Sequence, residues 1–251
     1  MKISILLPHM DDEVFIIPYL VFLREQKSHD ISFFYLTKSE GRNKRFDQKI
    51  REIESLKMIE LIFPEARIEF LGRKFDVEDL LLHEKVEILF EYFLRELDGT
   101  CDLIISPHFE GGHIDHDSAS ILASHLANTI NTELLTFNLY SARRNYGPFF
   151  QVAKPVGKLN RDVKVKVLGS SYLYMFLIPI RYKSQIKTWL GIYPALFWRI
   201  LVRRKFSLNQ FPSFNPNLKP NGGRVLYENR KDGNFQDWSS TILRSLNLRN
   251  N

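Results

Sequence analysis

Two stretches of this sequence share one pattern, in which an apolar run ends at a proline and gives way to histidine and acidic residues. The first run, Ile3–Leu7, ends at Pro8, and the run 102–106 ends in the same way. Each run has the length and the branched side chains of a buried strand. Apolar residues at helical spacing follow both polar stretches, over 14–23 and 118–129. A repeated strand–loop–helix pattern constrains the chain to an α/β fold.

The alternation of strand and helix patterns continues along the first half of the chain. The remaining predicted elements are strands at 31–36, 67–71 and 134–140, and helices at 45–62 and 79–97. Strands joined by helices predict a Rossmann-like, doubly wound, mostly parallel sheet with helices on both faces. The length of 251 residues suits a single domain over 1–251. We expect a regular α/β core over 1–148 and an irregular C-terminal extension over 149–251.

The loop after the first predicted strand carries one histidine and three consecutive acidic residues. As acidic side chains cap free N–H groups and suit the positive end of the helix dipole, 11–13 could serve only to start a helix. His9 and Asp12, three positions apart, could instead bind one divalent ion, with Asp11 as a second carboxylate beside it. This loop alone does not decide between the two interpretations.

The second loop, over 107–117, favours a metal site. Three of the seven histidines of the chain lie in it, at His108, His113 and His116. Because parallel strands align their carboxyl ends, both loops should meet at one edge of the sheet. The sequence therefore predicts a metal site assembled from two loops that lie about a hundred residues apart.

The motifs His-Met-Asp-Asp-Glu at 9–13 and His-Ile-Asp-His at 113–116 resemble the signature pair of the LmbE-like, or PIG-L, deacetylase family. That family consists of zinc-dependent de-N-acetylases that act mostly on N-acetylglucosamine-containing molecules. The resemblance covers the chain to about Tyr140 and is looser beyond. The chain departs from the family at Met10, where proline is usual, and at Gly111, where some thiol-sugar members carry tyrosine.

The resemblance implies a ligand set for the metal. By their positions in the motifs, His9, Asp12 and His116 are the implied ligands of one Zn²⁺ ion, with another divalent ion such as Fe²⁺ as the alternative. Two histidines and one carboxylate leave one position open for water, as in catalytic zinc sites. Zinc lowers the pKa of such a water from about 16 towards about 7 and polarises the acetyl carbonyl.

The resemblance also implies the catalytic residues. Asp11 is the implied base that accepts a proton from water at the metal. His113 is the implied protonated partner, which stabilises the oxyanion and then gives a proton to the leaving amine. Asp115 is the implied carboxylate that pairs with His113, orients its ring and raises its pKa.

Two arginines are candidates for substrate binding. Arg51 and Glu54 match an Arg-x-x-Glu pair of the family, whose arginine lies on the substrate side of the pocket; an exposed ion pair of little energetic value is the alternative. Arg143 follows the predicted strand 134–140 and could hold a sugar or a phosphate group, with ordinary solvation as the alternative.

The charge and the cysteine content limit the expected classes of binding partner and the expected cellular compartment. The formal net charge is +6, with the basic residues spread along the chain and no known nucleic-acid module, so we expect an anionic substrate or surface and no nucleic acid. The single cysteine, Cys101, excludes an internal disulfide and fits a reducing compartment. The chain starts directly with a strand, without a signal peptide, so we expect a cytoplasmic protein.

Segment 172–205 is dense in aromatic and basic residues. It could form a helical layer that covers the core. Alternatively, it could be an interfacial patch that contacts a membrane and a lipid-linked substrate. The oligomeric state is left open.

The sequence thus favours a zinc-dependent hydrolase that removes acetate from an N-acetylated amino sugar. The alternatives are a related amide hydrolase acting on a thiol or other conjugate, and a metal-binding protein without catalytic activity. The group that carries the sugar is left open.

Overall fold

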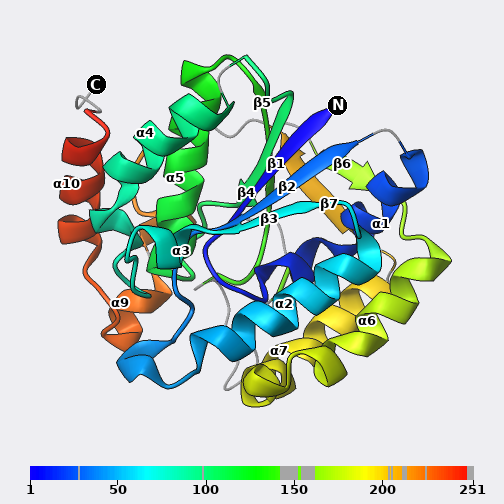
Figure 1. Cartoon of the computed structure of the whole chain (residues 1–251). Coiled ribbons are helices and arrows are strands. Elements are labelled where there is room, and N and C mark those ends of the chain that lie inside the picture. Colours follow the sequence, from blue (N-terminus) through cyan, green and yellow to red (C-terminus); the bar gives the residue numbers. More distant parts are fainter. Residues whose placement is uncertain are drawn as a thin grey trace.

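Among the residues that the computed structural model describes, seven strands form one sheet (Figure 1). The described residues are 1–27, 29–97, 99–141, 152–153, 162–202, 204, 206–210, 214–223 and 225–247. The strands are β1 (Lys2–Leu7), β2 (Asp30–Tyr35), β3 (Arg67–Phe70), β4 (Leu103–Pro107), β5 (Glu133–Phe137), β6 (Asp162–Val165) and β7 (Phe206–Gln210).

The strand order is β3-β2-β1-β4-β5-β7-β6. Strands β1 to β5 pair in parallel, whereas β7 is antiparallel to β5 and β6 is antiparallel to β7. The chain runs outward from β1 to β3 and returns to the middle of the sheet for β4, which is doubly wound topology. The predicted α/β, mostly parallel sheet is confirmed. The extension that we expected to be irregular contributes β6 and β7 to the same sheet.

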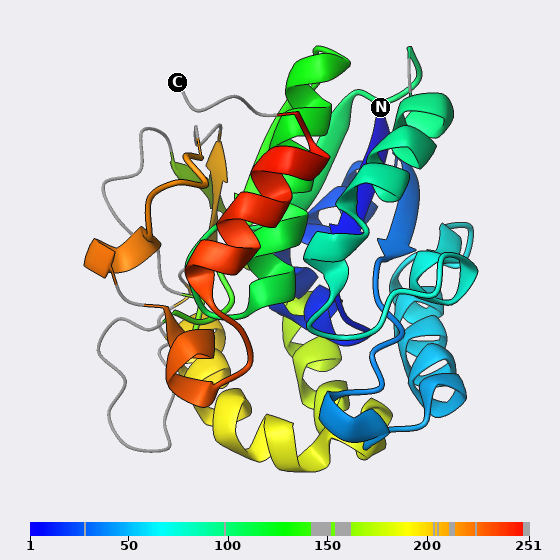
Figure 2. The same ribbon diagram turned by 90° about the vertical axis from the view of Figure 1, so that its left-hand side faces the viewer.

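Helices cover both faces of the sheet (Figures 1 and 2). One face carries α1 (Ile17–Gln26), α2 (Gln48–Ile62), α6 (Gly169–Arg181) and α7 (Ile186–Phe197). The other face carries α4 (Val86–Leu97) and α5 (Ile114–Thr129), with α10 (Phe235–Ser245) outside them. The short helical segments are η1 (Asp12–Ile16), η2 (Arg42–Lys44), α3 (Leu71–Lys74), η3 (Leu82–Glu84), η4 (Lys183–Gln185), η5 (Trp198–Val202), α8 (Pro220–Gly223) and α9 (Leu226–Arg230).

The side chains of β1 divide between the two faces of the sheet. Ile3, Ile5 and Leu7 belong to the core that includes α1 and α7, whereas Leu6 packs with residues of α4 and α5. All four are almost completely buried. Because both faces of a central parallel strand are covered, its sequence is a continuous apolar run. This is why the run Ile3–Leu7 predicted the position of β1 so closely.

The helix predicted over 79–97 is shorter in the structure, since α4 begins only at Val86. The preceding residues form turns, and Leu80 has a left-handed backbone with φ 72°. The backbone N–H groups of Leu80 and Leu82 donate to the Asp115 carboxylate over 2.7 and 3.2 Å. Hydrogen bonds to a buried carboxylate are stronger than those between neutral groups, so this tertiary contact overrides the local helical pattern.

The short apolar run within the tail 219–229 has a strand-like composition, but it forms the start of the short helix α9. Its apolar residues Leu226 and Tyr227 are buried, and Tyr227 joins the core around α10. Five residues are too few for the spacing of apolar side chains to distinguish a strand from a helix.

Segment 172–205 supplies most of α6, all of α7 and the single π-helical turn η5. These elements cover the core through buried residues such as Met175, Ile178 and Leu196, which agrees with the interpretation as a helical layer. None of the described helices is long and apolar enough to cross a membrane.

Helix α10 packs against the loop that follows β4 and stabilises it. Trp238 of α10 is fully buried, and its ring stacks on Phe109 with 5.7 Å between the centroids. Its indole N–H donates to the Ser118 hydroxyl of α5 over 2.8 Å. The C-terminal helix therefore holds both the loop and the helix that follow β4.

We expect Trp238→Ala to lower the free energy of unfolding by about 3–5 kcal/mol, because the substitution leaves a large cavity and removes the partner of Ser118. Urea denaturation followed by circular dichroism would measure the change. As a control, Ile88→Ala on the exposed face of α4 should change the free energy by less than about 0.5 kcal/mol. An equal loss in both variants would contradict this role of α10.

Candidate metal centre

The two predicted loops meet at the carboxyl edge of the sheet. Strands β1 and β4 are neighbours, with Ile5 opposite Ile105, so the chain leaves both strands side by side. The strand order reverses between these two strands, and such a position is where open α/β sheets bind ligands. His9 follows β1, and His113 and His116 lie at the start of α5, which follows β4. The predicted convergence of the two motifs is therefore present in the fold.

Three side chains from the two loops converge on one point. The Nδ1 atom of His9 lies 3.2 Å from Nε2 of His116. Asp12 contacts both rings, with Oδ1 at 3.2 Å from His116 Nε2 and Oδ2 at 3.5 Å from His9 Nδ1. All three residues are buried. The Asp12 carboxylate also accepts the backbone N–H of His9 over 2.9 Å, which fixes its position.

These atoms fit the donor set of a zinc ion. Two ligands at about 2.0–2.1 Å from a tetrahedral zinc ion lie roughly 3.3 Å apart, close to the three separations above. His9, His113 and His116 form a second combination, with one potential ligand atom of each within 4.8 Å of the others. The structure therefore offers two overlapping sets of three ligands, which share His9 and His116.

Asp115 holds the ring of His9. Its Oδ2 atom lies 3.1 Å from His9 Nε2 and 3.7 Å from His113 Nδ1, so the expected pairing with His113 is the longer contact. Burial raises the pKa of Asp115, but the hydrogen bond from His9 and the nearby imidazoles outweigh it and lower the pKa to about 2. A carboxylate on the far nitrogen of an imidazole orients the other nitrogen towards a metal.

His113 caps the helix that follows the second loop. Its Nδ1 atom accepts the backbone N–H of Asp115 over 3.2 Å, and α5 begins at Ile114. Burial and the neighbouring His9 lower the pKa of His113 well below its usual range, although Asp115 opposes the shift. Asp115 thus acts on this pKa in the expected direction, but burial outweighs its effect.

Asp117 lies inside α5, which begins at Ile114 and therefore four residues before the predicted helix start at 118. Its Oδ1 atom accepts the backbone N–H groups of Glu110 and Gly111, at 3.1 and 3.0 Å. Asp117 therefore shapes the loop before the helix. The cap of α5 is His113.

Arg51 is buried beside the site, so the alternative of an exposed ion pair with Glu54 is wrong. Its Nη2 atom donates to Asp11 Oδ1 over 2.7 Å and to the Met10 carbonyl, and its Nη1 atom donates to the Ser39 carbonyl over 2.6 Å. Glu54 accepts instead from the backbone N–H and the hydroxyl of Ser184. Arg51 thus positions the first loop and its Asp11.

Asp11 has an unusual backbone, with φ 145° and ψ −8°. Such a conformation costs about 1–3 kcal/mol in a residue other than glycine and is common at functional sites. Its N–H donates to Glu13 Oε2 over 3.0 Å, and Arg51 holds its carboxylate. Burial raises the pKa of Asp11 to about 7, although the Arg51 guanidinium opposes the shift.

Glu13 holds the backbone of this loop through its hydrogen bond with Asp11, a role that the sequence did not indicate. Its side chain is fully buried, accepts the hydroxyl of Tyr182 and accepts the N–H of Asp11. Its position directly after Asp12 suggested only a helix start. Its partner Tyr182 lies 169 residues further along the chain, so no local pattern indicates the contact.

A small cavity of about 140 Å³ opens onto the ligand cluster. Besides the residues of the two loops, Tyr140, Gln185, Trp189 and Ile192 line it, the last three from η4 and α7. Among the described residues, the side-chain N–H groups of Gln185 and Trp189 have no hydrogen-bond partner. Trp189 resembles an ordinary buried aromatic residue of the apolar helix α7, so its place in the sequence does not indicate a donor in the cavity.

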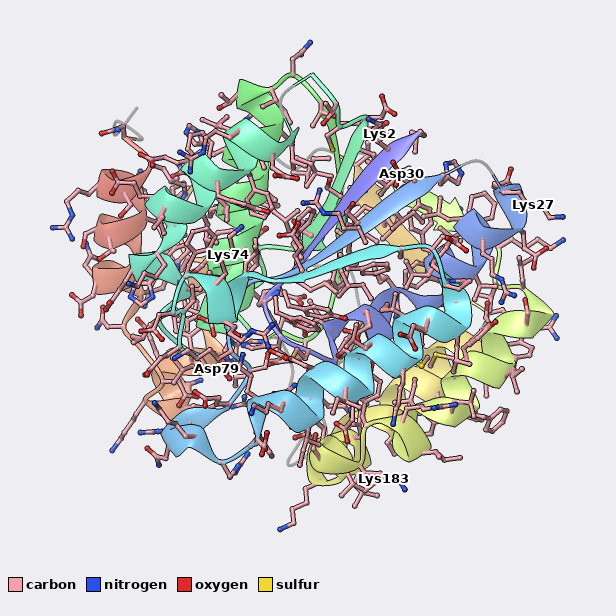
Figure 3. The ribbon with its side chains drawn as sticks, viewed as in Figure 1. Lys2, Lys27, Asp30, Lys74, Asp79 and Lys183 are labelled. Carbon is pink, nitrogen blue, oxygen red and sulfur yellow. The ribbon has the colours of Figure 1, made fainter. Side chains whose placement is uncertain are left out.

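Of the remaining residues considered for the site, His108 lies apart from the cavity and Asp79 lines it. The ring of His108 is buried, contacts the Thr136 hydroxyl over 2.9 Å and does not line the cavity. Arg143, the second predicted substrate residue, lies outside the described residues. Asp79, labelled in Figure 3, lines the cavity from the turn before α4.

Comparison with known proteins identifies the fold. No protein-family model matches the sequence, and comparison with curated proteins gives no match. Among solved structures, the zinc-inhibited form of a teicoplanin deacetylase is similar, with a TM-score of 0.62 at 12% identity over 85% of this chain and 100% of the other. The N,N'-diacetylchitobiose deacetylase of Pyrococcus horikoshii has a TM-score of 0.54 at 17% identity over 84% of each chain.

A hydratase also has this fold. The 4-carboxy-2-hydroxymuconate hydratase of Pseudomonas putida is similar with a TM-score of 0.54 at 14% identity, over 87% of this chain and 100% of the other. At such identities the likeness establishes a shared fold, and the reaction has to be argued from the site. The fold implied by the resemblance to LmbE-like deacetylases is confirmed.

Substitutions of Asp12 and His113 can show which of the two ligand sets binds the metal. Substituting a residue that hydrogen-bonds to a metal ligand typically weakens metal binding by about 10–100-fold. If Asp12 is itself a ligand, Asp12→Ala should weaken Zn²⁺ binding by more than this, whereas His113→Ala should weaken it by less than about tenfold. Isothermal titration of the metal-free protein with Zn²⁺ would measure both. The opposite order would assign the metal to His9, His113 and His116.

Gly112 provides a test of the loop geometry. A Cβ atom at Gly112 would overlap the carbonyl oxygen of Tyr140, so Gly112→Ala must displace the loop that carries His113. We expect a loss of roughly 2–3 kcal/mol in unfolding free energy and weaker Zn²⁺ binding. Gly169→Ala is the matched control, because a Cβ there meets no atom within 4 Å. Unchanged metal binding in Gly112→Ala would show that the close approach to Tyr140 does not set the site.

Proposed function

We propose that this protein is a metal-dependent hydrolase of the LmbE-like, or PIG-L, type that removes the N-acetyl group from an N-acetylglucosamine-type amino sugar. The observation that carries the proposal is the convergence of His9, Asp12 and His116 within 3.5 Å of one another, beside Asp11. A site without catalysis would need the ligands but not a strained and buried Asp11. The deacetylases with the same fold support this reaction class.

Zinc is the proposed ion, held by His9, Asp12 and His116, with another divalent ion such as Fe²⁺ as the alternative. Imidazole nitrogens and one carboxylate oxygen suit both ions. When bound, such a cation lowers the pKa of a coordinated water and polarises an amide carbonyl. Asp115 contributes by holding the far nitrogen of His9, which keeps Nδ1 directed at the cluster.

Asp11 is the proposed general base. Arg51 holds one carboxylate oxygen, and 14% of the Asp11 side chain is exposed where it lines the cavity. The carboxylate therefore has a fixed orientation and access to a water molecule, which general base catalysis requires. After it accepts the proton from the attacking water, Asp11 is also the group that can return this proton to the leaving amine.

His113 is the proposed donor to the developing oxyanion. Because Nδ1 accepts the backbone N–H of Asp115, the neutral ring carries its proton on Nε2. A neutral imidazole can donate this hydrogen bond to the carbonyl oxygen as negative charge develops. The resemblance implied a protonated His113, but its buried position favours the neutral form as the starting state.

The cavity indicates how the substrate binds. Its volume of about 140 Å³ holds a small group such as acetamido, whereas pockets for whole drug-sized ligands measure about 300–1,000 Å³. The unpartnered N–H groups of Gln185 and Trp189 are suitable donors to oxygen atoms of the amide or of the sugar. We therefore expect the acetamido end to enter and the remainder of the sugar conjugate to stay outside. The proposed compartment is the cytoplasm, and no nucleic-acid partner is proposed.

We expect Asp11→Asn to lower kcat by about 10²–10⁴-fold, because the amide cannot accept the proton from water. Release of acetate from a panel of N-acetylglucosamine derivatives would measure turnover, and elemental analysis would measure bound metal. The metal content should stay unchanged, since Asp11 is not one of the ligands.

Asp30→Asn is the control, because Asp30 lies at the opposite, amino edge of the sheet (Figure 3) and should leave kcat unchanged. Loss of metal from Asp11→Asn would show that the roles of Asp11 and Asp12 are misassigned. Release of a thiol-linked or other acyl group, without release of acetate from any amino sugar, would favour the related amide hydrolase.

A further inference from the structure

The outer face of helix α6 is apolar and exposed. Leu173, Phe176, Leu177 and Ile180 lie at the i, i+3, i+4 and i+7 spacing of one helix face. The side chains of Leu173, Phe176 and Ile180 are 62%, 57% and 59% exposed. The inner face of α6 is also apolar and packs on the core through Tyr174, Met175 and Ile178. A helix that is apolar all round is normally covered on every side.

The same apolar surface continues over neighbouring elements. Nine of the thirteen large apolar side chains that are exposed among the described residues belong to α2, α6, α7 and η5. We call these nine residues the outer apolar face: Ile50, Ile53, Leu173, Phe176, Ile180, Ile186, Leu190, Trp198 and Val202. A groove of about 500 Å³ between α2 and α6 connects Ile50 and Ile53 with Ile180. Figure 1 shows α2, α6 and α7 packed side by side at one corner of the molecule.

The segment that supplies α6, α7 and η5 of this face carries charges of one sign. Segment 163–227 contains eleven Lys and Arg residues and neither Asp nor Glu. The rest of the chain therefore holds 24 basic and 29 acidic residues, a net charge of −5, and the whole positive charge of the protein comes from this segment. Basic residues occur along the whole chain, so the positive charge of this segment reflects its lack of acidic residues.

Several of these basic residues border the outer apolar face. Arg181 and Lys183 line the groove with Ile180, and Lys187 is exposed on α7 between Ile186 and Leu190. Figure 3 shows Lys183 at the outer end of the α6–α7 pair, projecting away from the sheet. The one carboxylate of the groove, Glu54, already accepts two hydrogen bonds from Ser184.

We infer that the outer apolar face docks on the surface of an anionic lipid membrane. Exposed Leu, Ile, Phe and Trp side chains bordered by Lys and Arg are the composition of interfacial helices that lie in the headgroup region. Anionic headgroups neutralise the basic residues, and each basic residue near such a surface strengthens binding. A two-fold dimer through the same face would instead place like charges opposite each other, because both subunits present the same surface.

Docking on this face would bring the cavity close to the lipid. Helix α7 exposes Ile186 and Leu190 on one side, while Thr188 and Ile192 line the cavity from the other. A helix with its side chains is about 10–12 Å across, so the cavity would lie roughly one helix diameter from the headgroups. If the proposed function holds, this favours a lipid-linked amino sugar as substrate.

Vesicle sedimentation tests membrane docking without reference to catalysis. The full chain is mixed with vesicles of phosphatidylcholine alone, or of equal parts phosphatidylcholine and phosphatidylglycerol. We expect binding to the anionic vesicles that weakens as salt is added, and little binding to the neutral ones. The double variant Phe176→Ser/Leu190→Ser should bind at least tenfold more weakly, since it removes two exposed apolar side chains.

The triple variant Arg181→Gln/Lys183→Gln/Lys187→Gln should bind on the order of a hundredfold more weakly, at roughly fivefold per charge. Two matched controls change exposed residues elsewhere and should bind like the wild type: Ile88→Ser/Leu218→Ser for the apolar pair, and Arg95→Gln/Lys231→Gln/Arg244→Gln for the charges. Thermal unfolding of every variant checks that it folds.

Three outcomes would overturn the inference. The first is the absence of binding to anionic vesicles by the folded wild type. The second is equal binding by all folded variants, which would show that the contact lies elsewhere. The third is a dimer in sedimentation velocity that Phe176→Ser/Leu190→Ser dissociates, which would show that a second copy covers the face. Because none of these measurements needs turnover, they stay separate from the test of the deacetylase proposal.

Discussion

The parallel pairing of β1 with β4 is the contact on which the rest of the site depends. These strands are distant in the sequence but adjacent in the sheet, with Ile3 opposite Leu103 and Ile5 opposite Ile105. Their register fixes where each chain segment leaves the sheet, and so it brings His9 within 3.2 Å of His116. Both strands are buried by helices on their two faces, so the register is held by side-chain packing as well as by backbone hydrogen bonds.

Around this edge the protein buries an unusual number of ionisable groups, and each has specific partners. Asp115 accepts from two backbone N–H groups and contacts His9, Arg51 donates to two carbonyls and to Asp11, and Glu13 accepts from Tyr182. Removing one partner from such a group leaves a buried charge uncompensated, at a cost of about 3–5 kcal/mol. The same contacts that stabilise these charges also set the direction of each functional side chain. Stability and function are therefore coupled at this site, since a substitution that relaxes one contact disturbs both.

Much of the fold and of the candidate site could be predicted from short motifs, and the failures have identifiable causes. The apolar runs before Pro8 and Pro107 located β1 and β4 because central parallel strands are apolar on both faces. The start of α4 was misplaced because the Asp115 carboxylate, distant in sequence, binds the N–H groups of Leu80 and Leu82. The burial of Arg51 and the support from Glu13 depend on contacts with other segments, which helical periodicity does not encode. The unpartnered N–H groups of Gln185 and Trp189 could not be predicted, because they depend on how η4 and α7 pack against the cavity.

The attachment of Trp238 to Phe109 and Ser118 has a consequence for the order of events during synthesis. Helix α10 leaves the ribosome long after the loop that it clamps. Until then, the second loop and the start of α5 lack the contacts of Trp238 with Phe109 and Ser118. The geometry of the proposed metal site is therefore completed late in synthesis, once α10 can pack against Phe109.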